Sequence, residues 1–558
     1  MSVSDRVCIL SFDECSIARE WSYDKGSDIL YAPKRKVQCV MIRGLMSSWK
    51  QIVFYDFDTD MTKPLLFNLI TEIELAGFPV VAIVNDLGPT NVRLWKTLGI
   101  CIDNSNFENP ASPDRYIFVF ADAPHLMKLI RNNFLDHGFQ LSDGNYVHSG
   151  PVNELIKRSK SDLKTSYKLS ERHINVSGLQ RMNVKLAVQL ISETTAKSLQ
   201  YFGSKGLFLD KHWEKTSQFI SLTDSWFDLF NSRVPRDRKI SRNAYGLNLQ
   251  NQNEILKCMT ETVKSMKVIG SKSLYPFQKG LLVSSESLPK LQEMVKEKFD
   301  ISYLLTYRLN QDGLEHFFAC LRQMGACYQH PSAVAVKHRV RSHLLGKDSY
   351  LMGSKYNTES DCKGDNLTAG TFSFLDDDTP SQDNDDESLQ RELSLSAMIF
   401  CLPDECDGEG KENDVTKSLE VENEQLEDAV ERGGLEYFAG FIAHKFPKYA
   451  NLGSYVTMGD NSWTGTISRA DNKLKKPSKE FVDQVKTMEK MFICYHGEKS
   501  LKPGKGAVKE LSLEIANIME LPLDLVTYFV RCRTFFRIRI LNRDIISSRK
   551  IVNKVKKL

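Results

Sequence analysis

Acidic residues that could bind metal ions follow two strand-like runs near the N-terminus. Asp13 comes directly after the apolar run 7–12, and Asp86 follows the apolar run 79–84. Two carboxylates that lie close together repel each other, and a divalent cation with oxygen ligands is the usual relief. Phosphoryl transfer on nucleic acids commonly uses two such cations about 3.5–4 Å apart. If the fold brings the two strand ends together, the pair predicts metal-assisted phosphoryl transfer.

A third acidic ligand is expected from a helix. The run 308–318 contains Asp312 and Glu315, which lie one helical turn apart and therefore share a face. Position alone does not choose between them. A charged helix face that is simply solvated explains either residue equally well.

A structural role also explains many aspartates that follow strands, because Asp is common in turns and at helix N-caps. Asp122 opens the run Asp122-Ala-Pro-His125 and is well placed to be such a cap. We therefore expect Asp122 and His125 to support the site rather than to bind metal directly.

The elements that would position these residues follow an α/β order. Apolar runs predict three strands at 7–12, 37–44 and 51–58, then a helix at 63–76, a strand at 79–84, a helix at 91–98 and a strand at 116–120. This order is typical of the ribonuclease-H-like fold of the DDE/D integrase type. In that fold the first and fourth strands are neighbours, so Asp13 and Asp86 would face the same point.

The rest of the chain suggests four further segments. Residues 141–300 are expected to form a mainly helical insertion, and residues 301–355 the second part of the ribonuclease-H-like domain with the catalytic helix. Residues 356–434 are acidic and poor in aromatic residues, which predicts a disordered linker. Residues 435–558 predict a small helical domain with a basic end.

The charge is unevenly distributed. The 558 residues carry a net charge of +3, but residues 357–432 contain 23 acidic and 5 basic residues, which leaves +21 on the remainder. A basic body favours a polyanionic partner, although scattered solubilising charge would give the same total. The N-terminus has no signal-like segment and no run approaches a membrane span, so no membrane partner is expected. The twelve cysteines never form a C-x-x-C pair, which argues against structural zinc and favours a reducing compartment.

Several longer runs resemble the P-element transposase family nearly from end to end. They include Ser11-Phe-Asp-Glu14, Arg43-Gly-Leu-Met-Ser-Ser-Trp49, Val80-Val-Ala-Ile-Val-Asn-Asp-Leu-Gly88, Ile117-Phe-Val-Phe-Ala-Asp-Ala-Pro-His125, Asp224-Ser-Trp-Phe-Asp-Leu-Phe-Asn231, Arg308-Leu-Asn-Gln-Asp312, Glu436-Tyr-Phe-Ala-Gly440 and Phe535-Phe-Arg-Ile-Arg539. The similarity is weakest in the acidic segment.

The resemblance implies a catalytic and metal-binding triad of Asp13, Asp86 and Glu315 that holds two Mg²⁺ ions. It also implies that the helical insertion binds GTP as a cofactor that is not hydrolysed. The residues that match the family's nucleotide-contacting positions are Lys168, Val184, Asp228, Asn231 and Asp312. Asn183 departs from the family, where a lysine is expected. The residues alone do not predict this site, because the chain has no G-x-x-x-x-G-K-[ST] loop.

The family's activity is cut-and-paste DNA transposition. It implies hydrolysis at the transposon end, followed by attack of the freed 3′-hydroxyl on target DNA, in a nuclear homo-oligomer bound to double-stranded DNA. Candidates for gripping the DNA backbone are Lys337, Arg339, Arg341, Arg531, Arg533, Arg537 and Arg539. Ordinary solvated surface charge is the alternative interpretation of each of these residues.

The front of the chain departs from the family, whose full-length members carry a THAP-type zinc finger and a coiled coil before the catalytic domain. Because Met1 is only twelve residues before Asp13, we expect sequence-specific recognition to be lost or supplied elsewhere. A fragment, a misplaced start and a decayed copy all remain open. The alternative function is therefore a truncated or host-adopted binding protein that binds DNA or GTP without catalysis. A GTP-hydrolysing switch is disfavoured, because both a phosphate loop and an Asn-Lys-x-Asp run are missing.

Overall fold

The computed structural model describes residues 1–158, 166, 168–324, 330–344, 434–455 and 475–555, without the side chains of 179 and 547–555. The chain divides into two compact units. The first contains Met1–Arg19 and Lys34–Thr371, and the second contains Glu20–Pro33 and Phe372–Leu558. The predicted acidic linker 356–434 lies outside the described residues apart from residue 434.

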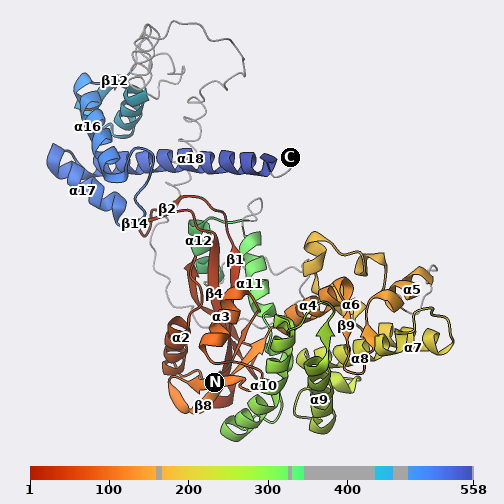
Figure 1. The fold of residues 1–558 in the computed structure, drawn as a ribbon. Helices are drawn as coiled ribbons and strands as arrows, with labels where there is room; N and C mark the ends of the chain where they lie inside the picture. The colour runs from red at the N-terminus through yellow and green to blue at the C-terminus, as the bar shows by residue number, and fades with distance from the viewer. Residues whose placement is uncertain (159–165, 167, 325–329, 345–433, 456–474, 556–558) are drawn as a thin grey trace, which may run out of the picture. The chain divides into compact units, whose positions relative to one another are not determined.

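The first unit is built on a six-stranded mixed sheet, with the strand order β5-β4-β1-β6-β8-β7 (Figure 1). The strands are β1 (Cys8–Ser16), β4 (Lys36–Gly44), β5 (Lys50–Phe57), β6 (Val80–Asn85), β7 (Asn106–Asn109) and β8 (Ser112–Ala121). β1 pairs antiparallel with β4 and parallel with β6, and β6 pairs parallel with β8. The predicted ribonuclease-H-like strand order and the adjacency of the first and fourth predicted strands are confirmed.

Helices cover the sheet because its central strands are apolar on both faces. All six residues of β6 are buried, which is typical of a parallel strand with a layer on each side. Helices α2 (Lys63–Leu75) and α3 (Pro89–Thr97) connect the strands, and α10 (Pro276–Phe299) packs on β8. α10 is also bonded to β8, because the Ser284 hydroxyl accepts the Ala121 N–H at 2.9 Å and the Ser287 hydroxyl donates to the Val119 carbonyl at 2.7 Å.

The insertion is mainly helical, as predicted. After α4 (Ala123–Asp136) come α5 (Gly150–Arg158), α6 (Val184–Leu190), α7 (Glu193–Ser204), α8 (Trp213–Phe230) and α9 (Leu249–Ser265). A small sheet joins β9 (Phe139–Gln140) with β10 (Tyr146–Val147) and β11 (Lys267–Val268). Within residues 184–204 the chain forms two helices rather than one, because Ser192 separates α6 from α7 and caps α7 by accepting the Thr195 N–H.

Two further helices of the first unit follow the insertion in sequence. They are α11 (Asp312–Gln323) and α12 (Ala333–Leu344), and α11 packs on β1 and β4.

The second unit has its own apolar core between helices. It contains a helix at 434–445, α16 (Lys479–His496), α17 (Ala507–Met519) and the long α18 (Leu523–Val555). The unpredicted strands β2 (Ser22–Asp24) and β3 (Ile29–Tyr31) also belong to it, since β3 pairs with β14 (Gly504–Lys505). In the part of the chain that the structure describes, we find no helix long and apolar enough to cross a bilayer.

Candidate active site

Asp13 and Asp86 lie on neighbouring strands of the central sheet. Asp13 is on β1, two residues beyond Ser11, which pairs with Val84 of β6. Asp86 comes directly after the last residue of β6. Because β1 and β6 run parallel, their carboxyl ends reach the same edge of the sheet. The structure therefore brings the two aspartates to one place although 72 residues separate them in sequence.

Asp86 is held by groups at the start of α3. Its Oδ1 accepts the backbone N–H of Gly88 at 3.0 Å and the side-chain amide of Asn91 at 2.6 Å. A Cβ atom at position 88 would lie only 3.1 Å from Asp86 Oδ1, so glycine allows this close approach. Asn91 is buried and belongs to α3, which fixes the carboxylate relative to the helix.

Glu315 reaches the same region from the first turn of α11. Gln311, the N-cap residue of this helix, donates its side-chain amide to the Phe12 carbonyl at 2.8 Å. Its backbone N–H donates to Asp122 Oδ1 at 2.7 Å. The start of the helix is therefore bonded both to the strand that carries Asp13 and to the end of β8.

Asp122 and His125 support this arrangement. Asp122 is the N-cap of α4, as expected, and accepts the His125 N–H. His125 Nδ1 lies 2.6 Å from Asp122 Oδ2 and 3.7 Å from Glu315 Oε1. Burial opposes charge on the imidazole, but the hydrogen bond to Asp122 prevails and raises the pKa of His125. A protonated His125 would thus place a positive charge beside Glu315.

Apart from His125 beside Glu315, no cationic side chain pairs with Asp13, Asp86 or Glu315 among the described residues. Burial, with the charges of Asp86 and Glu315 adding to it, raises the pKa of Asp13 to about 7. Burial and the charge of Asp122 raise the pKa of Glu315. Among the described residues, no Lys or Arg forms an ion pair with Asp13, Asp86 or Glu315. A set of oxygen ligands with unbalanced negative charge fits Mg²⁺, which prefers carboxylates and water.

A cavity of about 730 Å³ adjoins Glu315 within the first unit. All five residues expected to contact the nucleotide line it, together with Glu315 and other side chains of both signs. The lining residues include Lys168, Val184, Lys185, Asp228, Asn231, Arg233, Arg242, Asp312 and Glu315. A volume of this order is large enough for a nucleotide-sized ligand.

Asp228 is the most strongly bonded acidic residue of the cavity. It lies on α8, and its Oδ1 accepts Arg242 Nε at 3.0 Å. Its Oδ2 accepts the Ser241 hydroxyl at 3.1 Å and lies 2.6 Å from Lys239 Nζ. These contacts hold the carboxylate in place and partly neutralise it.

Asp312 lines the cavity together with Glu315 of the predicted triad. Burial, with the charges of Asp122 and Glu315, raises the pKa of Asp312 to about 7. Arg233 lies 3.6 Å from its Oδ2. Asp312 and Glu315 are one turn apart on α11, so a ligand in the cavity and the triad contact the same helical turn.

Three family models match this chain. They are the TNP-like RNase H N-terminal domain over residues 1–99, the TNP-like GTP-binding insertion domain over 124–243, and the TNP-like RNase H C-terminal domain over 307–338. The chain is also 33% identical to the transposable element P transposase of Drosophila melanogaster over 557 residues, which is 100% of this chain and 69% of that protein. The chain belongs to the P-element transposase family.

One further relative and one solved structure agree with this assignment. The human DNA transposase THAP9 is 27% identical over 323 residues, which span 53% of this chain and 34% of that protein. The solved structure of the Drosophila P element transposase strand transfer complex matches with a TM-score of 0.60 and 39% identity, covering 62% of this chain and 79% of that chain. The ribonuclease-H-like fold and the GTP-binding insertion domain are therefore features of this family member.

Asn183, which departs from the family, has a structural role. Its side chain caps α6 by accepting the Leu186 N–H at 3.2 Å. Lys185, two residues further, lines the cavity and forms no ion pair with any described residue. Lys185 therefore provides a positive charge at the cavity, which the absence of a lysine at position 183 did not lead us to expect. Arg233 and Arg242 were also missed, because only the fold brings them to this cavity.

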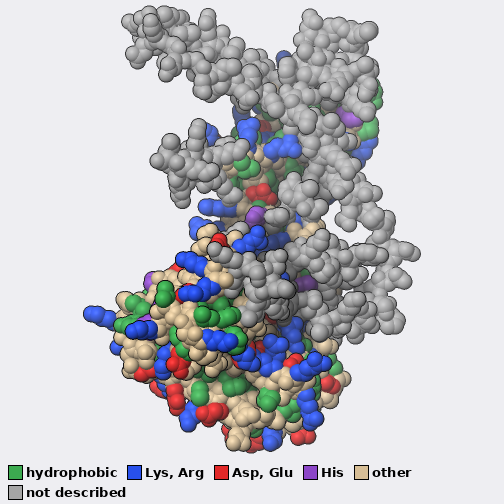
Figure 2. Space-filling view, turned by 90° about the vertical axis from the view of Figure 1, so that its right-hand side faces the viewer, with side chains coloured by type: hydrophobic (Ala, Val, Ile, Leu, Met, Phe, Trp, Pro, Cys, Tyr) green, Lys and Arg blue, Asp and Glu red, His purple; other side chains and the backbone are tan. Residues whose placement is uncertain are grey.

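Several predicted DNA-contacting residues make internal contacts. Arg533 forms a two-point ion pair with Glu489 at 2.5 Å. Arg537 is buried and donates to the carbonyls of Gly497 and Ser500, and Arg339 donates to the Leu321 carbonyl at 2.6 Å. Lys and Arg side chains on the face shown in Figure 2 are dispersed among acidic and apolar ones.

Proposed function

We propose that this protein is a cut-and-paste DNA transposase that catalyses metal-dependent cleavage at transposon ends and strand transfer, with GTP as a cofactor that is not hydrolysed. The observation that supports the proposal is that Asp13 lies on β1 and Asp86 directly after the neighbouring parallel strand β6, while Gln311, at the start of the helix that carries Glu315, is hydrogen-bonded to Phe12, the residue before Asp13. Membership of the transposase family supports it.

The carboxylates of Asp13, Asp86 and Glu315 would hold two Mg²⁺ ions, which when bound activate the attacking hydroxyl and stabilise the leaving oxygen. The protein's own part is to position these ligands. Gly88 and Asn91 orient Asp86, and Gln311 ties the helix of Glu315 to β1.

The cavity beside Glu315 is the proposed GTP site. The Asp228 carboxylate would accept two hydrogen bonds from the guanine edge. Arg242 and Ser241, which now donate to this carboxylate, would then have to share its oxygens or release them. Lys168 and Lys185 would attract the phosphates. Binding without hydrolysis is consistent with the lack of a phosphate loop in the sequence.

The substrate would be double-stranded DNA, both transposon end and target, and the working form a homo-oligomer in the nucleus. Membership of the transposase family and the basic charge outside residues 357–432 support this substrate, oligomer and location.

The test is cleavage and strand transfer on labelled transposon-end DNA with Mg²⁺ and GTP. Wild-type protein is compared with Glu315→Gln, and with Glu293→Gln as a control on the exposed face of α10. We expect Glu315→Gln to lose at least about 100-fold in rate, because a metal ligand is neutralised. If neither wild type nor variant reacts, yet both bind DNA equally, the protein is a transposase-derived binding protein without catalysis.

A further inference from the structure

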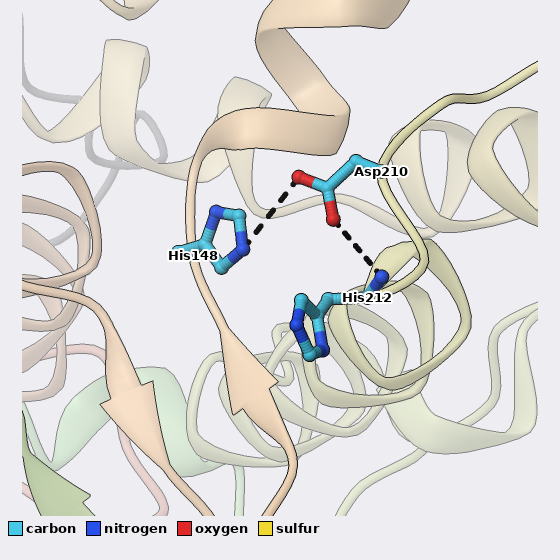
Figure 3. Close-up of side chains that lie close together, drawn as sticks. All are labelled: His148, Asp210 and His212. Atoms are coloured by element: carbon cyan, nitrogen blue, oxygen red, sulfur yellow. Dashed lines mark hydrogen bonds and ion pairs between the residues drawn. The ribbon is translucent and has the colours of Figure 1, made fainter.

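Two histidines and an aspartate gather in the insertion, and neither the triad nor the proposed nucleotide cavity uses them. One ligand atom from each of His148, Asp210 and His212 lies within 4.8 Å of the other two (Figure 3). We propose that these residues form a binding site for a transition-metal cation of the Zn²⁺ class, with one coordination position left for water or another ligand.

The spacing of the first two ligands already suits zinc. His148 Nε2 lies 3.5 Å from Asp210 Oδ2. Two ligands of a tetrahedral zinc ion, each about 2.0–2.1 Å from the metal, lie about 3.3 Å apart. The His212 backbone N–H holds the other oxygen, Asp210 Oδ1, at 2.9 Å. Figure 3 shows that this contact leaves Oδ2 directed toward His148. Only the His212 ring has to move closer, which rotation about its side-chain bonds can supply.

The two segments that carry the ligands are held together without any metal. The Glu154 carboxylate on α5 accepts the Leu209 N–H at 3.1 Å and contacts the Asp210 N–H at 3.5 Å. Lys215 of α8 pairs with Asp143 at 2.7 Å. The backbone at Gly150 lies so close to the Asp210 side chain that a Cβ atom at position 150 would be 2.4 Å from Asp210 Oδ2. Since the fold fixes the backbone around the ligands, metal binding need not order it.

The ligand types select the metal class. His212 is the N-cap residue of α8 but makes no capping bond with its side chain, and its ring nitrogens form no hydrogen bond with any described residue. Two imidazoles and one carboxylate favour Zn²⁺ or similar transition metals over Mg²⁺ and Ca²⁺. The negative charge of Asp210 offsets the positive end of the α8 dipole, which would otherwise oppose a cation.

One existing contact must change on binding. The Gly150 N–H donates to His148 Nδ1 at 3.1 Å. A neutral imidazole that binds a cation through Nε2 carries its proton on Nδ1, so this hydrogen bond has to be released. The loss of one backbone hydrogen bond is small compared with two metal–nitrogen bonds and one metal–oxygen bond.

Zinc titration of the full chain tests the proposal. The protein is purified without a polyhistidine tag, stripped with a chelator and titrated by calorimetry in excess Mg²⁺, which competes at the catalytic carboxylates. His148→Ala and His212→Ala are compared with His137→Ala, an exposed histidine outside the cluster. We expect one Zn²⁺ per chain, with affinity weakened at least about 10-fold in the first two variants and unchanged in the third. Circular dichroism shows whether each variant is folded. If His148→Ala is not, His148→Gln is titrated in its place.

Cobalt substitution gives an independent readout. Co²⁺ in this site should give the intense visible absorption of a four- or five-coordinate ion, without a sulfur-to-metal band. The proposal is wrong if wild-type protein binds no Zn²⁺, if the cluster variants bind it as tightly as wild type, or if the cobalt spectrum shows thiolate ligands. None of these outcomes bears on the transposase reaction, which is measured separately.

Discussion

Gln311 donates its side-chain amide to the backbone carbonyl of Phe12 at 2.8 Å, across 299 positions of sequence. Phe12 is the residue before Asp13, and Gln311 precedes the helix that carries Glu315. This bond therefore helps to fix the distance between Asp13 and Glu315 of the proposed triad. The bond itself uses the Gln311 amide and the Phe12 carbonyl, which are not among the proposed metal ligands.

Replacement of Gln311 by alanine should impair catalysis more than folding. The change leaves the Phe12 carbonyl without this partner, which should lower the free energy of unfolding by about 1–3 kcal/mol. Because the start of α11 would lose its side-chain hydrogen bond to β1, Glu315 would be positioned less tightly, and we expect strand cleavage to fall by about 10-fold or more. Single-turnover cleavage and thermal unfolding are measured together, with the exposed Gln218→Ala as control. Unchanged cleavage in a destabilised variant would show that Gln311 is merely structural.

Lys185 should contribute to nucleotide binding in place of a lysine at position 183. Removal of a cation that faces phosphate oxygens should cost about 1.5–3 kcal/mol, so Lys185→Ala should weaken GTP binding by about 10-fold or more. The loss should shrink at high salt. Equilibrium binding of a fluorescent GTP analogue measures it, and Lys257→Ala on the exposed face of α9 serves as the control. Equal affinities for the two variants would remove Lys185 from the site.

His496 should make the second unit acid-sensitive. Burial and the nearby charges of Arg537 and Arg533 lower the pKa of His496 to about 4. Its Nδ1 accepts the Lys502 N–H at 3.2 Å, which the neutral ring allows. Between pH 6.5 and about 4 the unfolded chain binds a proton here that the folded chain does not. Stability from this residue is thus fully present above pH 6.5 and is lost as the pH falls.

The size of this effect follows from the shift. A change of one pKa unit corresponds to about 1.4 kcal/mol, so the free energy of unfolding should fall by about 3 kcal/mol across the window. His496→Asn keeps a hydrogen-bond acceptor but does not titrate, and it should flatten the dependence. Denaturant unfolding at pH 7 and pH 4.5 provides the comparison; parallel curves for the two proteins would contradict the assignment.

Arg533 should stabilise the fold rather than grip DNA. Its guanidinium pairs with Glu489, and both side chains are about 85% shielded from solvent. Arg533→Leu leaves a poorly solvated carboxylate alone and should cost about 3 kcal/mol. The double variant Arg533→Leu with Glu489→Leu should recover most of this loss, since no charge is then left unpaired. Thermal unfolding tests the pair, and a DNA affinity that drops with Arg533 even in the double variant would argue for a DNA contact.

Local sequence patterns were enough for the main elements of the first unit. The short apolar runs at 7–12 and 79–84 correspond to β1 and β6, because strands in the middle of a sheet that is covered on both faces are apolar on both faces. Asp122 was recognisable as a helix N-cap from its local sequence, because a cap bonds to the backbone of the residues that directly follow it.

Short or long-range features escaped the sequence analysis. Strands β2 and β3 have three residues each, too few for a periodic signal. β2 pairs with β3, and β3 pairs with β14, where Gly504 lies opposite Leu30 from a distant part of the sequence. The break between α6 and α7 depends on one capping serine within an otherwise helical pattern.

The sequence by itself therefore determined which acidic residues are available and which longer runs form strands or helices. Through its resemblance to known proteins, it also indicated the family of the chain. The tertiary structure decided which of these residues meet. Burial on β1 and in the first turn of α11 raises the pKa values of Asp13 and Glu315, and the fold places Lys185, Arg233 and Asp312 around one cavity. Chain folding sets such through-space relationships, because electrostatic energy depends on distance and burial rather than on separation along the sequence.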